Sequence, residues 1–433
     1  MSPRRDRSLF ALSLGLQGCI VAGLVLAARS GCWPSTVVTG MALCFVPYAG
    51  ALIFSRSLPT KRAVDRIALV TALCFGGALV LAPPLLSDDL YRYLWEGRLW
   101  LEGLNPYRLA PDDPALAHLR DELWANINNK SLASIYPPLA QLSFVVAQLL
   151  GGKVWTLKLL ALFAHLLSVA AIARVSTERK ASLALALNPL LLTEGALNGH
   201  FDVLCGTALL ISAWALSRHR FVQAGVAACA AVGLKVIGLV ALPLLVRRPK
   251  ILVATGAVSA LLLVPLLWSR ALGDPGSGLG QFATRWRGND SVFGLIHALS
   301  GALFAESLAG LVSRSIVAVV LLLLCFLMIH RRLPSLQATR VLVWAVLLLS
   351  PQVHPWYLGW LLPLEVAAGG WAGLVWSASV LLAYAPLDQW VTERVWEHSP
   401  LLQIVEYSAV AVALMLDPRR PSLRAPAVEE QFP

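Results

Sequence analysis

Apolar runs alternate with short polar segments from residue 9 to residue 416. Because roughly 20 apolar residues cross a bilayer as a helix, the pattern predicts a bundle of membrane-spanning helices. The runs are Leu9–Ala28, Pro34–Phe54, Ile67–Leu86, Val154–Ala173, Ala181–Ala196, Val203–Leu216, Phe221–Val232, Val236–Val246, Ile251–Trp268, Leu308–Ile329, Gln337–Val353, Trp356–Ala368, Trp371–Ala385 and Leu401–Leu416.

Leu139–Leu150 is too short to cross comfortably, and we expect a re-entrant or surface helix there. Phe221–Val232 and Val236–Val246 are two short halves that meet at Lys235. The pattern predicts an all-α, polytopic transmembrane helical bundle of about 11–14 spans. Residues 1–416 form one domain, with an outer loop at 87–136 that contains interfacial helices. Residues 417–433 are expected to be a disordered cytoplasmic tail.

Composition supports a membrane protein, because 58% of the residues are hydrophobic and only 14% are charged. The net charge of +11 comes from basic clusters at alternate turns, which marks one side of the membrane as cytoplasmic. The basic charge therefore does not indicate a nucleic-acid partner. Seven cysteines without a CxxC or Cys/His spacing favour neither a disulfide framework nor a zinc site. We expect a multi-pass protein of the cell membrane.

Alternation of the runs puts every polar, motif-like segment on the outer face. Polar groups beside spans are costly, so their convergence predicts a shared cavity. The segments are Asp88 to Tyr136, Glu194 to Asp202, Lys235, Arg285 to Ser291, and Pro351 to Trp356.

Asp88 and Asp89 are adjacent carboxylates at the start of an expected interfacial helix, Asp88 to Trp100. Two adjacent carboxylates repel each other, and acid–base chemistry is one function that would favour such a pair. Arg92 and Glu96 share a helix face with Asp88, so Arg92 would tune Asp88 and leave Asp89 slightly favoured as a base. The alternative is a solvated helix N-terminus on a loop that only packs. No further ligand accompanies the pair, so a metal is not predicted.

Lys235 lies between two half-length runs with no acid nearby in sequence, and a phosphate is a suitable partner. Snorkelling to the surface is the alternative. The other candidate substrate-binding residues are each also compatible with an ordinary turn, loop or interfacial belt. They are Arg92, Glu96, Tyr136, Asn198, His200, Asp202, Arg285, Arg287, His354, Trp356 and Tyr357.

These motifs together resemble the GT-C superfamily of integral-membrane glycosyltransferases, and in particular the bacterial polyprenol-phosphate-mannose-dependent mannosyltransferases. The resemblance is carried by DDLYRYLWEG…GLNPY at 88–107, IYPPLAQ at 135–141, NPLLLTEGALNGHFDVL at 188–204, GLKVIGLVALPLL at 233–245, RWRGNDSVF at 285–293 and SPQVHPWYLGWLLPL at 350–364.

The resemblance implies inverting transfer of a sugar, with mannose expected, from a polyprenyl monophosphate to a lipid or glycan acceptor on the extracytoplasmic face. In such enzymes an acid of the first outer loop acts as base, which is Asp88 or Asp89 here. The lipid-linked sugar is then a co-substrate, and no cofactor is expected. A lipid-A-type or protein O-glycosyltransferase on the same scaffold, or a lipid or sugar transporter, is the alternative.

Overall fold

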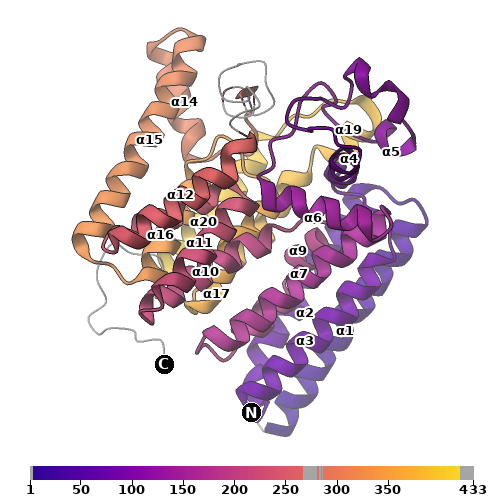
Figure 1. The fold of residues 1–433 in the computed structure, drawn as a ribbon. Coiled ribbons are helices and arrows are strands. Elements are labelled where there is room, and N and C mark those ends of the chain that lie inside the picture. Colours follow the sequence, from indigo (N-terminus) through magenta and orange to yellow (C-terminus); the bar gives the residue numbers. More distant parts are fainter. Residues whose placement is uncertain (1–2, 267–279, 282–283, 285, 420–433) are drawn as a thin grey trace.

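The computed structural model describes residues 3–266, 280–281, 284 and 286–419, and these form an all-α helical bundle. Figure 1 shows long helices packed side by side, with shorter helices over the upper end. The helices that make up the bundle are α1 (Pro3–Arg29), α2 (Pro34–Phe54), α3 (Lys61–Val80), α7 (Val154–Val175), α10 (Asp202–Ser217), α11 (Phe221–Leu234), α12 (Pro249–Leu266), α15 (Glu306–Arg331), α16 (Ser335–Leu348), α17 (Leu358–Ala367), α18 (Ala372–Ser379) and α20 (Pro400–Leu416).

Five of these helices, α1, α2, α3, α7 and α15, are long and apolar enough to cross a membrane. The other helices are shorter. Some of them are followed, directly or after one residue, by a 3₁₀ helix, as α18 is by η7 (Val380–Tyr384) and α11 is by η4 (Val236–Leu245). The expected all-α polytopic bundle is confirmed. Pro34–Phe54 is α2 without a change at either end. The run expected at Ile67–Leu86 is displaced, because α3 begins at Lys61 and ends at Val80.

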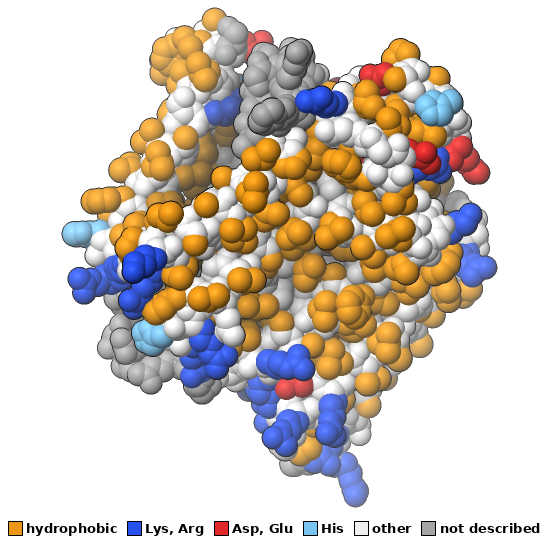
Figure 2. All heavy atoms as spheres, in the orientation of Figure 1, with side chains coloured by type: hydrophobic (Ala, Val, Ile, Leu, Met, Phe, Trp, Pro, Cys, Tyr) orange, Lys and Arg blue, Asp and Glu red, His pale blue; other side chains and the backbone are white. Residues whose placement is uncertain are grey.

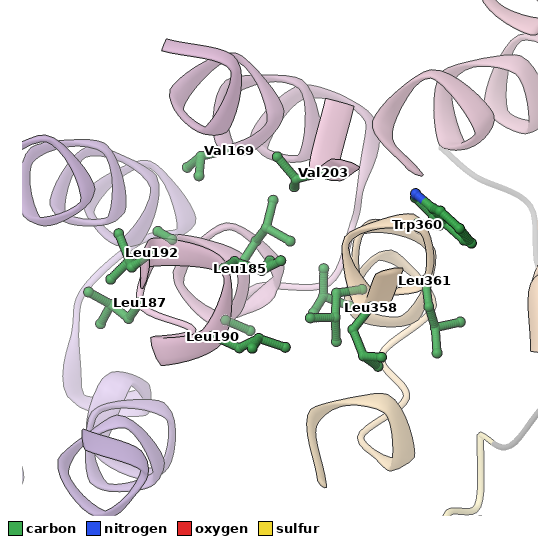
Figure 3. Close-up of a cluster of buried hydrophobic side chains, with 14 of the residues drawn as sticks. Val169, Leu185, Leu187, Leu190, Leu192, Val203, Leu358, Trp360 and Leu361 are labelled. Atoms are coloured by element: carbon green, nitrogen blue, oxygen red, sulfur yellow. The ribbon is translucent and has the colours of Figure 1, made fainter. Parts of the chain in front are cut away.

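The run at Ala181–Ala196, expected as one helix, is broken. It forms α8 (Ala181–Ala186), α9 (Pro189–Leu192) and a π-helix (Thr193–Leu197). Pro189 has no N–H to continue α8, and the Asn188 side chain accepts a hydrogen bond from Leu191 N at 3.1 Å to start α9. The leucines of this segment belong to the same buried hydrophobic cluster as Val203 and Leu358 (Figure 3).

The expected break at Lys235 is confirmed. Lys235 has extended backbone angles (φ −151°, ψ 143°) at the end of α11, and the chain continues as the 3₁₀ helix η4 (Val236–Leu245). Pro243 cannot donate a backbone hydrogen bond, which disfavours a regular α-helix there. Lys235 thus follows the last residue of α11 and precedes the first residue of η4.

The outer loop expected at 87–136 folds as a cap on the bundle. Its elements are α4 (Asp89–Leu101), a 3₁₀ turn (Pro114–Leu119) and α5 (Glu122–Ala125), and α6 (Pro138–Leu149) follows. Figure 1 shows α6 lying across the upper end of the bundle, in line with the surface helix expected there. Gly97 lets α4 approach α6 closely, because a Cβ at Gly97 would lie 2.3 Å from Phe144 O.

Two further helices, α14 (Val292–Leu303) and α19 (Leu387–Glu393), were not expected from the sequence. Residues 417–419 were expected to begin a disordered tail, but they pack against the bundle. Asp417 is fully buried and accepts hydrogen bonds from Trp371 N and Ala372 N, and Arg419 pairs with Glu178. Residues 420–433 lie outside the described residues.

The two ends of the bundle differ in charge (Figure 2). Lys and Arg side chains gather at the lower end, and Asp and Glu side chains lie mainly at the upper right. We call the lower end the basic end; it carries the turns at residues 55–62, 174–181, 217–221, 246–250 and 331–335. We call the opposite end the loop end; it carries residues 81–137, 198–201 and 350–357.

Candidate active site

The segment that carries Asp88 and Asp89 is fixed from below by a buried lysine. Lys158 of α7 is fully buried, and its ammonium donates to the carbonyls of Leu79, Val80 and Ala82 at 3.1, 2.9 and 2.5 Å. These carbonyls end α3, where a cation compensates the helix dipole. Leu86 N then donates to Asn198 Oδ1 at 3.3 Å. The two aspartates are therefore positioned by α7 and by the turn before α10.

Asp88 and Asp89 share one hydrogen-bond donor but have opposite pKa shifts. Asn128 Nδ2 donates to Asp88 Oδ1 at 2.5 Å and to Asp89 Oδ1 at 3.2 Å. Burial raises the pKa of Asp88, and the charge of Asp89 raises it further, to about 6. Burial would also raise the pKa of Asp89, but the nearby His200 outweighs it and holds that pKa below its usual range.

Asp89 is the carboxylate around which other side chains converge. Tyr93 Oη and Tyr136 Oη donate to Asp89 Oδ2 at 3.4 and 3.5 Å. His200 Nε2 lies 3.8 Å from the same oxygen, an ion-pair distance, and has no direct hydrogen-bond partner in the part of the chain that the structure describes. Asp89 thus faces two phenols and an imidazole.

The imidazole of His200 is held by a second carboxylate, Glu194 of the π-helix. Nδ1 of His200 lies 2.8 Å from Glu194 Oε2, and Glu194 Oε1 accepts from Asn198 at 3.0 Å and from Tyr384. Burial lowers the pKa of His200, but Asp89 and Glu194 outweigh this and raise it to about 9. Gly199 has a φ of +79°, which lets the turn bring His200 back over Glu194.

Three rings from the two loop segments form a stack. Trp356 lies between His200 and His354, with ring centroids 4.2 and 4.3 Å apart and interplanar angles of 12° and 6°. Burial lowers the pKa of His354 to about 3, so its imidazole is neutral, whereas that of His200 is charged. Tyr357 packs edge-on against His354 at 5.2 Å.

Lys235 lies beside the ring of Tyr136, the residue whose hydroxyl reaches Asp89. Its ammonium is 3.3 Å from Asp202 Oδ1 and 5.3 Å from the centroid of the Tyr136 ring. Phe201, and not Asp202, is the N-cap residue of α10. Asp202 accepts a hydrogen bond from Trp360 Nε1 at 2.7 Å.

A hollow between α4, α6, α10 and α11 is bordered by some of these groups, whereas Asp89 and His200 are not among its lining residues. Its walls are mainly apolar or aromatic, and Asp202 and Lys235 are its charged residues. It is lined by Tyr93, Tyr136, Ala140, Phe144, Phe201, Asp202, Leu234 and Lys235.

Arg92 and Glu96 lie apart from this cluster. Arg92 does not pair with Asp88; its guanidinium donates to Glu96 at 3.4 Å and to the backbone carbonyls of Asn128, Asn129 and Leu132 at 2.6–3.0 Å. The charge of Arg92 is the weakest influence on the pKa of Asp88. Both side chains are buried within the loop. Arg92 lowers the pKa of Asp88, which is the expected direction, but burial and the charge of Asp89 outweigh it.

Glu96 is satisfied in the same way, because it accepts from Ser134 and Gln141 at 2.7 and 2.6 Å. Arg287 is half exposed and pairs with Asp290 at 2.9 Å. Its neighbour Gly288 forms a β-bridge with Gln352, which places residues 286–290 beside the segment of His354. Arg285 lies outside the described residues.

Several residues of the cluster were missed by sequence reasoning. Asn128, Tyr384 and Lys158 belong to no recognisable motif, although Lys158 had one signal, a lone cation within an apolar run. Tyr93 lies within the DDLYRYLWEG run but was not singled out as a site residue. Among the described residues no three His, Cys, Asp or Glu side chains are grouped so as to hold a metal ion.

One known family model matches part of the chain. Residues 35–249 match the MptA_B family model, described as alpha-(1->6)-mannopyranosyltransferase, N-terminal domain. The match includes Asp88, Asp89, Tyr136, His200 and Lys235 and ends before residues 286–290 and 351–357. No curated protein and no solved structure matches the chain. The family supports a mannosyl transfer reaction. Over residues 35–249, this chain is therefore similar to the N-terminal domain of the MptA_B family of mannosyltransferases.

Proposed function

We propose that the protein is an inverting mannosyltransferase that takes its sugar from a polyprenyl monophosphate and transfers it to a lipid or glycan acceptor on the extracytoplasmic face. The observation that carries the proposal is that Tyr136 contacts both a carboxylate and a cation: its hydroxyl lies 3.5 Å from Asp89 Oδ2, and the Lys235 ammonium lies 5.3 Å from its ring centroid. A proton acceptor and a cation within reach of one side chain are the two groups that transfer from a lipid phosphate requires.

Asp89 is the proposed base. As the acceptor oxygen attacks C1 of the sugar, its proton passes to the Asp89 carboxylate and the bond between C1 and the phosphate oxygen breaks. Attack opposite to the leaving group inverts C1. His200, held by Glu194, keeps Asp89 ionised and fixes its orientation.

Lys235 is proposed to bind the leaving polyprenyl phosphate, on which negative charge remains. Lys235 lines the hollow, and the partly exposed apolar side chains of Phe201 and Leu234 offer a surface for the prenyl chain. Asp202 orients the ammonium through the 3.3 Å contact.

The basic end is proposed to face the cytoplasm, by the distribution of Lys and Arg. The site is then extracytoplasmic, where nucleotide sugars are not available and a lipid must carry the activated sugar. This geometry favours a lipid-linked donor over a nucleotide sugar.

The donor is tested with membranes containing the protein and radiolabelled polyprenyl-phosphate mannose. We expect the label to move from polyprenyl-phosphate mannose to a second product. Labelled nucleotide-linked mannose should give no such product when the synthesis of polyprenyl-phosphate mannose is blocked. Separation of glycolipid, glycan and protein fractions distinguishes the lipid-A-type and protein O-glycosyltransferase alternatives. Labelled polyprenyl-phosphate mannose that crosses the bilayer without cleavage would instead indicate a transporter.

The pH dependence separates Asp89 from Asp88 as the base. A base must be ionised, so activity through Asp88 would fall about tenfold per pH unit as the pH drops below about 6. The pKa of Asp89 is held below its usual range, so Asp89 stays ionised there. We expect kcat/KM to change by less than about threefold between pH 7 and pH 5. A break near pH 6 that disappears in Asp88→Asn would assign the base to Asp88.

A further inference from the structure

A second pocket opens at the basic end, the opposite end of the bundle from the loop segments of the candidate active site. It lies between the turn that joins α10 to α11, the end of η4, and the last turn of α15 with the start of α16. One part of its lining is apolar, with Leu244, Cys325, Met328 and Leu333. Another part is basic, with His219, Arg247 and Arg248.

The two adjacent arginines can bind an anion. Arg247 donates to Ile329 O at 2.5 Å, and the guanidinium of Arg248 lies 4.0 Å from the centroid of the Phe221 ring. A guanidinium has five N–H donors, so each arginine keeps donors for a further partner, and both side chains are exposed. No Asp or Glu is among the described residues that line the pocket.

The helix beside this pocket has an uncovered apolar surface. Only 11% of the most apolar window of α15 is buried within the protein, compared with 56% for α7. Leu322, about one turn before the pocket-lining Cys325, and Phe326, which follows Cys325, are 70% and 64% exposed. Figure 1 shows α15 at the edge of the bundle, and Figure 2 shows Lys and Arg side chains near its lower end.

We propose that this pocket binds an anionic phospholipid. The headgroup phosphate pairs with Arg247 and Arg248, and the acyl chains lie along the exposed apolar face of α15. A basic pocket between helices at one membrane surface suits such a headgroup. Because Arg247 bonds to the last turn of α15 and Arg248 packs on α11, the bound lipid links α15 to the bundle.

The test uses the full-length protein, purified in detergent and stripped of lipid. Binding of phosphatidylglycerol and of phosphatidylcholine is measured by native mass spectrometry, and the effect of each lipid and of inorganic phosphate on Tm is recorded. We expect phosphatidylglycerol alone to raise Tm. The double variant Arg247→Gln/Arg248→Gln should bind it at least ~10-fold more weakly, the loss expected for charge-assisted hydrogen bonds.

Arg62→Gln is the matched control, because Arg62 is an exposed arginine of the same basic end outside the pocket, and it should bind like the wild type. Wild-type affinity in the double variant would overturn the proposal. Equal effects of phosphatidylglycerol and phosphatidylcholine would also overturn it, and equal protection by inorganic phosphate would indicate a free-anion site instead. If the double variant does not fold, the comparison of the three ligands on the wild-type protein still decides.

Discussion

Asp89→Asn is expected to lower mannosyl transfer by roughly 10²–10⁴, the usual contribution of general-base catalysis. Asparagine keeps the size of the side chain, and its carbonyl oxygen can still accept from Tyr93, Tyr136 or Asn128. It cannot take a proton from the acceptor hydroxyl, whose pKa is far above neutrality. The loss should therefore appear in kcat, with little change in the KM for the donor.

Asp88→Asn is the matched control. Asp88 lies one residue away and shares Asn128 as donor, yet no phenol or imidazole of the described residues reaches it. We expect that variant to keep activity within about tenfold of the wild type, because it retains the proposed base. Equal losses in the two variants, or full activity in Asp89→Asn, would contradict the assignment. Loss of wild-type activity on adding a chelator would show that the transfer needs a metal, which the sequence did not predict.

Local features of this fold could be predicted from the sequence. The helix at 88–100 was expected from its amphipathic pattern and forms as α4. Its apolar residues Leu90, Leu94 and Leu99 are fully buried within the protein. Periodicity fixes which residues share a face, whereas the partner of that face depends on the rest of the fold.

Long-range partners could not be predicted. Arg92 has Asp88 and Glu96 one turn away on either side, so spacing alone left its partner open. Carbonyls at residues 128–132 decide it, because they surround the guanidinium and hold it towards Glu96. In the same way, Glu194 and His200 were recognised as titratable neighbours, but their order around Asp89 depends on a π-helix and on Gly199.

Lys235 shows both limits in one residue. The sequence predicted a chain break at this lysine and a need for an anionic partner, and the break is confirmed. Its nearest described anion is Asp202, which lies 33 positions earlier in the chain but only 3.3 Å away. A protein carboxylate beside the ammonium does not exclude phosphate binding, because Lys235 keeps other donors and is 18% exposed towards the hollow.

Removal of the Lys235 charge is expected to lower transfer by roughly 10²–10³, the usual cost of losing one electrostatic contact to developing charge. Lys235→Met alone would leave Asp202 buried without its cation, and the resulting destabilisation would obscure the catalytic effect. The double variant Lys235→Met/Asp202→Asn removes both charges together, while the amide oxygen of the introduced asparagine can still accept from Trp360.

Asp202→Asn alone is the control, because it keeps the cation and should retain more activity than the double variant. Tm and kcat are measured for the wild type, for Asp202→Asn and for the double variant. We expect the double variant to have a Tm near that of Asp202→Asn and a kcat roughly 10²–10³ lower, since only the double variant lacks a cation for the leaving phosphate. Lys235→Arg should recover part of the rate, because arginine restores the charge but not the compact ammonium geometry. Equal kcat values in the double variant and in Asp202→Asn would show that Lys235 serves Asp202 alone and that the phosphate is bound elsewhere.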